Sequence, residues 1–199
     1  MIAAQAGLRR SASWAAAAQV ALPAFGLIAL ALLRGVLNEQ STAQGFASGA
    51  AFGVALLGIG LVAGSRPGRP RVGALLTGAG GGLMLIAVPV LLHARPLGIG
   101  VRPEPMLLWV AITILVASSE EVLLRGVLLE GLERLIGPVS AVAVTSLLFG
   151  LMHVPLYGWT VVPVDVAAGV WLAGLRRLSG GVAAPIVAHV LADLATRWL

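Results

Sequence analysis

The ionisable side chains in the second half of the chain lie inside strongly apolar sequence, where such groups are unusual. Three segments carry them: TILVASSEEVLLRGVLL with Glu120, Glu121 and Arg125, FGLMH with His153, and AHVLAD with His189 and Asp193. An ionisable group inside a membrane helix costs about 2.5–3.5 kcal/mol on insertion scales, and it usually faces the bundle interior and marks a functional site. The sequence therefore indicates one functional cluster built from three helices.

The spacing of these residues suggests what the cluster does. Glu121 and Arg125 are four residues apart, so they share a helix face and can pair. Glu120 points about 100° away from Glu121 around the helix and is free for other work. His189 and Asp193 are also four apart, which lets a carboxylate orient an imidazole. A glutamate with two histidines can deprotonate a water and stabilise an oxyanion, the two tasks of amide hydrolysis without a covalent intermediate.

Other hydrolytic designs fit this sequence less well. The chain has no cysteine, which excludes thiol catalysis, and it has no HExxH segment of the common zinc proteases. We therefore expect no cofactor, with a zinc-dependent version that uses His153 and His189 as ligands as the alternative mechanism. An aspartyl pair of Asp165 and Asp193 is disfavoured, because Asp165 follows Pro163 near an expected helix start and is interpreted as a capping residue.

The composition identifies the elements that must hold these residues. Hydrophobic residues make up 59% of the 199 and charged residues 11%, and the mean hydropathy is +1.00. Soluble domains average about 45–50% apolar and about 25% charged residues, so a soluble enzyme is excluded. The formal charge of +5 comes from arginines in short gaps between apolar runs. That pattern is a topology signal rather than a phosphate-binding surface, so we expect no nucleic-acid partner.

We predict an all-α fold, a polytopic transmembrane helical bundle of about seven spans, since each span needs roughly 20 mostly apolar residues. The expected spans are 14–33, 45–64, 72–92, 106–126, 139–158, 161–175 and 181–198. Residues 1–199 are expected to form one membrane domain, with variable N-terminal spans in 1–104 and the motif-bearing core in 105–199. Glycines at every fourth residue, such as Gly78 and Gly82, favour close helix packing within the monomer over a dimer face.

The arginines also predict an orientation. With seven spans, eight fall on the side of the N-terminus: Arg9, Arg10, Arg66, Arg69, Arg71, Arg134, Arg176 and Arg177. Four fall on the other side: Arg34, Arg95, Arg102 and Arg197. The positive-inside rule then places the N-terminus in the cytoplasm and the C-terminus outside, in a multi-pass integral protein of the plasma (inner) membrane.

The predicted spans do not place the three motifs at the same depth in the membrane. At ~1.5 Å rise per residue, Glu120 lies about 21 Å from an outer helix start at 106, and His189 about 12 Å from an inner start at 181. A helix that starts at 139 would place His153 about 21 Å from the inner side, too far out to meet Glu120. A span shifted to about 143–162 would bring His153 to roughly 15 Å.

At these residues the sequence resembles the CAAX-protease and bacteriocin-processing membrane proteins, the CPBP or Abi family. The family pattern is EExxxR, then FxxxH, then HxxxN or HxxxD, and this chain has EEVLLR (120–125), FGLMH (149–153) and HVLAD (189–193) in that order. The resemblance covers roughly residues 105–199.

The resemblance implies a role for each matched residue. Glu120 would activate the water, Glu121 and Arg125 would shape and hold the site, and His153 would help to position the water. His189 and Asp193 would form the oxyanion side. Asp193 stands where the prenyl-protein proteases carry Asn; Asn donates a hydrogen bond as it stands, whereas Asp must be protonated to do so. Asp193 is therefore expected either to donate as the protonated acid or to orient His189.

The function that follows is an intramembrane endopeptidase with a glutamate base, acting on membrane-bound or membrane-delivered proteins or peptides in contact with the lipid bilayer. The alternatives are the metal-dependent version of this protease, a non-catalytic immunity or partner-binding membrane protein, and a small proton-coupled transporter. The bias toward Ala, Gly and Arg with no Lys is typical of a GC-rich genome, so a bacterial host is expected and a farnesylated CAAX peptide is a poor candidate substrate.

Overall fold

A computed structural model of the chain describes residues 2–37, 42–65, 68–91 and 105–198. Every regular element in these ranges is a helix, so the all-α prediction is confirmed. This follows from the apolar composition, because a backbone surrounded by lipid has no water to bond to and an α-helix satisfies its hydrogen bonds within one segment.

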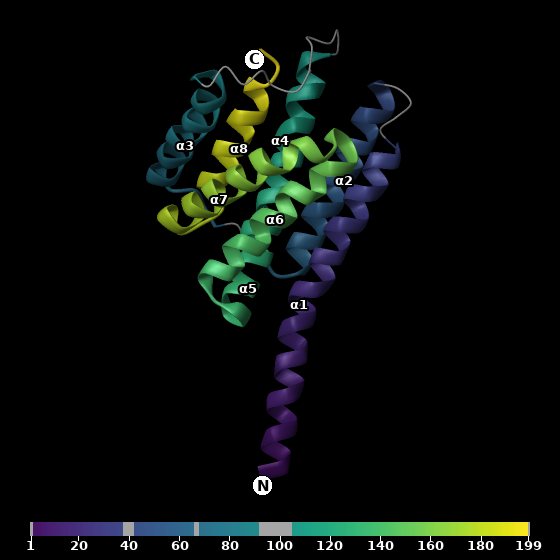
Figure 1. Cartoon of the computed structure of the whole chain (residues 1–199), viewed down its shortest axis with the longest axis vertical. Coiled ribbons are helices and arrows are strands. Elements are labelled where there is room, and N and C mark those ends of the chain that lie inside the picture. The colour runs from purple at the N-terminus through teal and green to yellow at the C-terminus, as the bar shows by residue number, and fades with distance from the viewer. Residues whose placement is uncertain (1, 38–41, 66–67, 92–104, 199) are drawn as a thin grey trace.

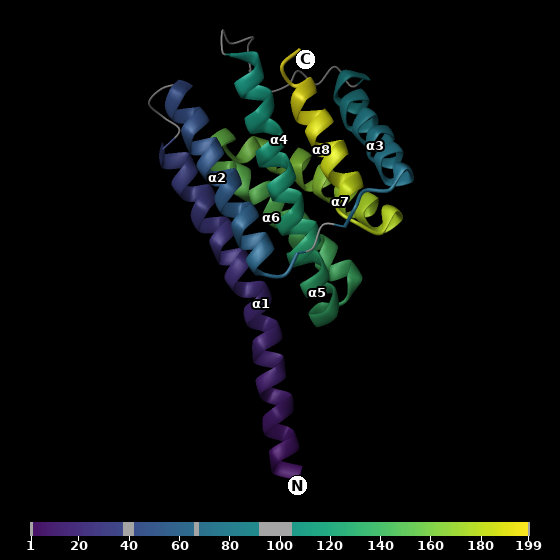
Figure 2. The same cartoon turned by 180° about the vertical axis from the view of Figure 1, so that it is seen from behind.

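The described part of the chain forms eight α-helices and two shorter helical turns. In chain order they are α1 (Ile2–Leu37), α2 (Thr42–Val62), α3 (Val72–Leu91), α4 (Met106–Leu123), the π-helical turn η1 (Leu124–Leu128), α5 (Leu129–Ile136), α6 (Pro138–Tyr157), the 3₁₀ turn η2 (Trp159–Val161), α7 (Val162–Ser179) and α8 (Ala183–Ala195). Figures 1 and 2 show them as one bundle, with α4 near its middle, α2 on one side of it and α8 on the other.

Four helical segments are long and apolar enough to cross a membrane: Ala16–Leu37, Ala43–Val62, Met106–Ile136 and Pro138–Tyr157. Two shorter apolar helices, Val72–Val88 and Ala183–Ala195, accompany them. The protein is therefore a multi-pass membrane protein. Each of the seven predicted spans coincides with a helical segment, but by length and composition the number of crossings lies between four and seven.

The glycines predicted to allow close helix packing do so inside the monomer. A Cβ atom built on Gly53 of α2 would lie 2.8 Å from the Leu115 side chain of α4. One built on Gly78 of α3 would lie 2.5 Å from the Ala184 carbonyl oxygen of α8. Helices that touch at glycine approach more closely than larger side chains would permit. The prediction of packing within the monomer is therefore confirmed for these two helix pairs.

The apolar core lies where α1, α2, α4, α6 and α7 meet. Fully buried leucines from four different elements, among them Leu27, Leu56, Leu128 and Leu172, form its centre. The N-terminal turns of α1 project beyond the bundle, and the two ends of the chain lie at opposite ends of the molecule (Figure 1). Among the ionisable residues of the second half, Glu120, Glu121, Arg125 and His189 are buried within the bundle.

Candidate active site

The turn at Gly137 explains how Glu120 and His153 reach the same level. Met106–Ile136 is one continuous helical segment of 31 residues, which at ~1.5 Å per residue is about 46 Å long, more than the ~30 Å of a bilayer core. Its last turns, and the start of α6, can therefore lie beyond the apolar layer. Glu120 precedes Ile136 by 16 residues and His153 follows Pro138 by 15, so both lie about 23 Å from the turn.

The predicted span 139–158 coincides with α6, which runs from Pro138 to Tyr157, so the expectation that a shift to about 143–162 is needed to bring His153 to the level of Glu120 is not met. The expectation assumed that every helix starts at the membrane surface. Here Gly137, with a φ of 80° that favours glycine, reverses the chain directly after α5. The register of this helical hairpin, rather than the position of a membrane surface, sets the depth of His153.

Glu121 and Arg125 form the buried pair predicted from their spacing. Arg125 Nη1 donates to Glu121 Oε1 at 2.8 Å, and both side chains are fully buried. Arg125 also donates from Nη2 to the Gly169 carbonyl oxygen of α7 at 3.1 Å. Arg125 lies in the π-helical turn η1, a rare local geometry that often occurs at functional sites. The guanidinium thereby ties α4 to α7.

His189 is held mainly by Glu121 rather than by Asp193. Its Nδ1–H donates to Glu121 Oε1 at 2.9 Å, the oxygen that also accepts from Arg125. Nε2, on the other edge of the ring, lies 3.5 Å from Asp193 Oδ1 and 3.8 Å from Glu120 Oε2. The Asp193 side chain is 41% exposed, whereas that of Glu120 is 2% exposed. The spacing-based expectation that Asp193 orients His189 thus missed the shorter bond, which comes from another helix.

Phe149 lies at the centre of the three motifs. Its ring is 4.8 Å from the Arg125 guanidinium carbon. It meets the rings of His153 and His189 edge-on, with centroid distances of 4.9 and 5.2 Å. Such cation–π and edge-to-face contacts are attractive and directional. The motif FxxxH therefore contributes a packing surface for both imidazoles as well as the histidine itself.

Asp165 has a different role from the one predicted. It lies in the first turn of α7, but the N-terminus of that helix has no side-chain cap. Instead, Asp165 Oδ2 lies 3.1 Å from His153 Nδ1. The interpretation as a capping residue is wrong because the turn after α6 places α7 back against α6, so that Asp165 faces His153 across the interface. No sequence spacing within one helix could have indicated this pair.

Arg34 of α1 was assigned only to the topology pattern, yet its helix packs against the motif-bearing α6. Its guanidinium carbon lies 4.9 Å from the centre of the Phe52 ring of α2. The neighbouring Gly35 packs against Pro155, two residues beyond His153. The first half of the chain thus contributes a helix that packs beside the His153 motif.

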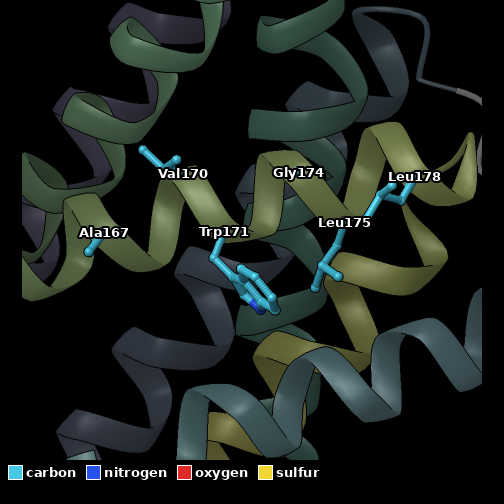
Figure 3. Close-up of a pocket in the computed structure, with 6 residues that line it drawn as sticks. All are labelled: Ala167, Val170, Trp171, Gly174, Leu175 and Leu178. Atoms are coloured by element: carbon cyan, nitrogen blue, oxygen red, sulfur yellow. The ribbon is translucent and has the colours of Figure 1, made fainter. Parts of the chain in front are cut away.

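The cluster of ionisable residues is distinct from the apolar cavity on α7. That cavity has a volume of about 350 Å³ and is lined by Ala167, Val170, Trp171, Gly174, Leu175 and Leu178 (Figure 3). No ionisable side chain lines it, so it offers no acid–base chemistry. Within the described parts of the chain, no group of three or more His, Asp and Glu residues is arranged to hold a metal ion.

In contrast, the charged residues of α5 lie outside the cluster, as expected for a solvated face. Glu130 pairs with Arg134 at 2.9 Å, and Glu133 pairs with Arg177 of α7 at 2.7 Å. All four side chains are substantially exposed. They connect α5 to α7 at one end of the molecule.

The motif-bearing part of the chain has a family match. Residues 102–195 match the family model described as type II CAAX prenyl endopeptidase Rce1-like. Neither the curated proteins nor the solved structures include a significant match. The matched segment contains all six residues predicted for the site and Asp165, and it leaves out α1, α2 and α3.

Proposed function

We propose that the chain, whose residues 102–195 match the Rce1-like family model, is an intramembrane endopeptidase of the CPBP type in which Glu120 activates the hydrolytic water. The family match supports a protease of the CAAX-protease type. The assignment of roles to individual residues rests on the geometry of the cluster.

The observation that carries the proposal is the difference between the two adjacent glutamates. Glu121 accepts hydrogen bonds from Arg125 and His189 through a single oxygen, so it is committed to holding the site. Glu120 is 2% exposed, and among the described residues its nearest ion-pair partner is His189 Nε2 at 3.8 Å. That distance is too long for a direct hydrogen bond and suits a bridging water. Glu120 is therefore the carboxylate available to take a proton.

The reaction then proceeds in two steps. Glu120 takes a proton from the water as the water oxygen adds to the peptide carbonyl carbon, and the carbonyl electron pair moves to its oxygen. A protonated His189, whose Nδ1–H is already bound to Glu121, donates Nε2–H to this oxyanion. When the carbonyl re-forms, the C–N bond breaks, and its electron pair goes to the amine nitrogen, which takes the proton back from Glu120. No metal or other cofactor takes part.

We propose proteins or peptides of the membrane as substrates, because Glu120 and His189 lie deep within helices packed for a bilayer. Residues 105–199 would hold the catalytic core, and α1–α3 would complete the single domain. The arginine distribution supports a cytoplasmic N-terminus, and we propose the plasma membrane as the location. Arg66, Arg95 and Arg102, which contribute to that distribution, lie outside the described residues.

The test is a comparison of membrane proteomes from cells that carry the wild type, Glu120→Ala or Glu130→Ala. Glu130 is the matched control, since it is an exposed carboxylate on the same continuous helix. We expect specific cleavage fragments in the wild type and the Glu130→Ala cells, with the intact precursors accumulating only in Glu120→Ala cells. Identical fragment patterns in all three, with the biological function intact in Glu120→Ala, would instead support the non-catalytic membrane protein.

A further inference from the structure

His153 faces two hydrogen-bond acceptors with one nitrogen. Its Nδ1 lies 3.1 Å from Asp165 Oδ2 and 3.0 Å from the Phe149 carbonyl oxygen, one helical turn earlier. A carbonyl oxygen and a carboxylate accept but do not donate, so Nδ1 carries the hydrogen. The other nitrogen, Nε2, lies on the opposite edge of the ring and is left for the site.

The α6–α7 hairpin fixes Asp165 in this place. Gly158, with a φ of 79°, ends α6, and η2 leads directly into α7. The two helices then touch at small residues: a Cβ atom on Gly150 would lie 2.8 Å from the Val166 side chain, and one on Gly169 would lie 2.9 Å from Ser146 Cα. These contacts leave little freedom for sliding, so the register that places Asp165 opposite His153 is a property of the fold.

The arrangement repeats one already seen at His189. There Nδ1 bonds to the Glu121 carboxylate of α4, and Nε2 faces Glu120. At His153, Nδ1 bonds to the Asp165 carboxylate of α7, and the ring packs edge-on against Phe149, as the ring of His189 does. Each imidazole is therefore held through Nδ1 by a carboxylate from a different helix. An acid at Nδ1 fixes both the tautomer and the orientation of a functional histidine.

We propose that Asp165 is the positioning residue of His153: it holds Nδ1–H and thereby directs Nε2 toward the space beside Glu120. This inference builds on the proposed hydrolase, but the Asp165–His153 bond itself does not depend on it. Asp165 acts through His153 and touches no reacting atom. Its loss leaves the Phe149 carbonyl as the remaining acceptor, which is neutral and therefore binds the ring less strongly.

The decisive experiment is nitrogen NMR of the full-length protein in lipid with ¹⁵N-labelled histidine. The chain has only three histidines, so His93→Gln and His153→Gln assign the ring signals. We expect Asp165→Asn and Asp165→Ala to move the Nδ1 resonance of His153 and to leave that of His189 in place. Asp193→Asn should move the Nε2 resonance of His189 and leave the signals of His153 in place. Glu133→Gln, which removes an exposed carboxylate, should move the resonances of neither histidine. A His153 Nδ1 signal that is unchanged in both Asp165 variants would overturn the proposal.

A second test of the Asp165 proposal measures proteolytic activity. Using fragments that depend on Glu120 in the membrane-proteome comparison, we expect Asp165→Ala to lower their formation about 10–100-fold, the usual cost of losing such a partner. In a His153→Gln background, Asp165→Ala should cause no further loss, because groups that act through one another are not additive. If Asp165→Ala lowered fragment formation by the same factor in the His153→Gln background as in the wild type, Asp165 would not act through His153. If no fragment depends on Glu120, the proposed function fails, while the NMR result still decides the Asp165–His153 bond.

Discussion

At the scale of single residues, two adjacent carboxylates have different surroundings because they point to different sides of one helix. Glu121 faces Arg125 and His189 and is fully buried, and its second oxygen, Oε2, has no hydrogen-bond partner in the described structure. Glu120 faces the space bordered by His189 Nε2. A buried ion pair is expensive to form and still more expensive to break. The arrangement therefore makes one glutamate structural and leaves the other for chemistry.

Arg125→Ala should destabilise the protein as well as inactivate it. The substitution leaves the Glu121 charge buried without its partner and removes the bond to the Gly169 carbonyl, and breaking a buried pair costs about 3–5 kcal/mol. Thermal unfolding in detergent or lipid measures this loss. Arg134→Ala is the matched control, since its pair with Glu130 is exposed and should change stability by less than about 1 kcal/mol. Equal melting temperatures for the two variants would contradict a structural role for Arg125.

Asp193→Asn should be milder than Glu121→Gln. Asp193 lies 3.5 Å from His189 Nε2 and is partly exposed, whereas Glu121 holds Nδ1 of the same ring at 2.9 Å. We expect Asp193→Asn to keep the fold and to retain activity within about tenfold, because the Asn amide can donate where a protonated Asp would. Glu121→Gln should lower both activity and the melting temperature. Loss of activity in Asp193→Asn with a changed pH profile would show instead that an ionised Asp193 is the working partner of His189.

Sequence spacing could predict interactions within one helix but not across helices. The Glu121–Arg125 pair follows from a separation of four residues. The Asp165–His153 pair spans a turn and depends on hairpin register. The His189–Glu121 bond joins residues 68 positions apart. Such contacts depend on how helices pack, and a single sequence contains no direct measure of that packing.

At the scale of elements, two helical hairpins set the positions of the site residues. The turn at Gly137 brings α6 back along the α4–α5 segment, and the turn at Gly158 brings α7 back along α6. The predicted start of α6 at 139 agrees with the observed Pro138, but the depth comparison that suggested a shift assumed that all helices begin at the membrane surface, whereas the α4–α5 segment is longer than a bilayer core. Counting residues from the turn rather than from the membrane surface gives the observed alignment.

Gly169→Ala should damage the site from a distance. Its Cβ would lie 2.9 Å from Ser146 Cα, a backbone atom that cannot move alone, so α7 must shift away from α6. Overpacking of this kind costs about 1–3 kcal/mol, and the shift would also stretch the Arg125 bond to the Gly169 carbonyl. Gly174→Ala is the control on the same helix: nothing lies within 4 Å of its Cβ, and alanine favours the helix by roughly 0.5–1 kcal/mol. If the melting temperature of Gly169→Ala were equal to or higher than that of Gly174→Ala, the close α6–α7 contact would be contradicted.

At the scale of the whole molecule, the composition predicted a helical membrane bundle, and the structure and the family match agree with it. The number of crossings was less accessible from the sequence. Helix α7 contains Asp165, Arg176 and Arg177 and does not qualify as a span by length and composition. It contributes both Asp165 and the Gly169 carbonyl to the site. In sequence, a helix that packs on the bundle with charged residues near both ends resembles a weak span, because both are apolar only in the middle.

Orientation can be tested by cysteine labelling, since the chain has no native cysteine. Gly68→Cys lies in the exposed connection before α3, and Trp198→Cys, at a residue that is 63% exposed, lies at the C-terminus. If the N-terminus is cytoplasmic and the number of crossings is odd, a membrane-impermeant maleimide applied to intact cells should label Trp198→Cys alone. Gly68→Cys should react only after lysis. The opposite labelling would reverse the orientation, and equal labelling before lysis would contradict an odd number of crossings.

The most direct test of the central claim is cleavage by purified wild type and Glu120→Gln in liposomes, with a substrate identified by its accumulation in Glu120→Ala cells. Glutamine keeps the shape of Glu120 but cannot take a proton, so cleavage should fall by roughly 10²–10⁴-fold, while the melting temperature stays near that of the wild type. Cleavage by the wild type should persist in the presence of a chelator. If the chelator abolished cleavage and added zinc restored it, a metal ion would be the group that activates the water. Full cleavage by Glu120→Gln would contradict the proposal that Glu120 is the base.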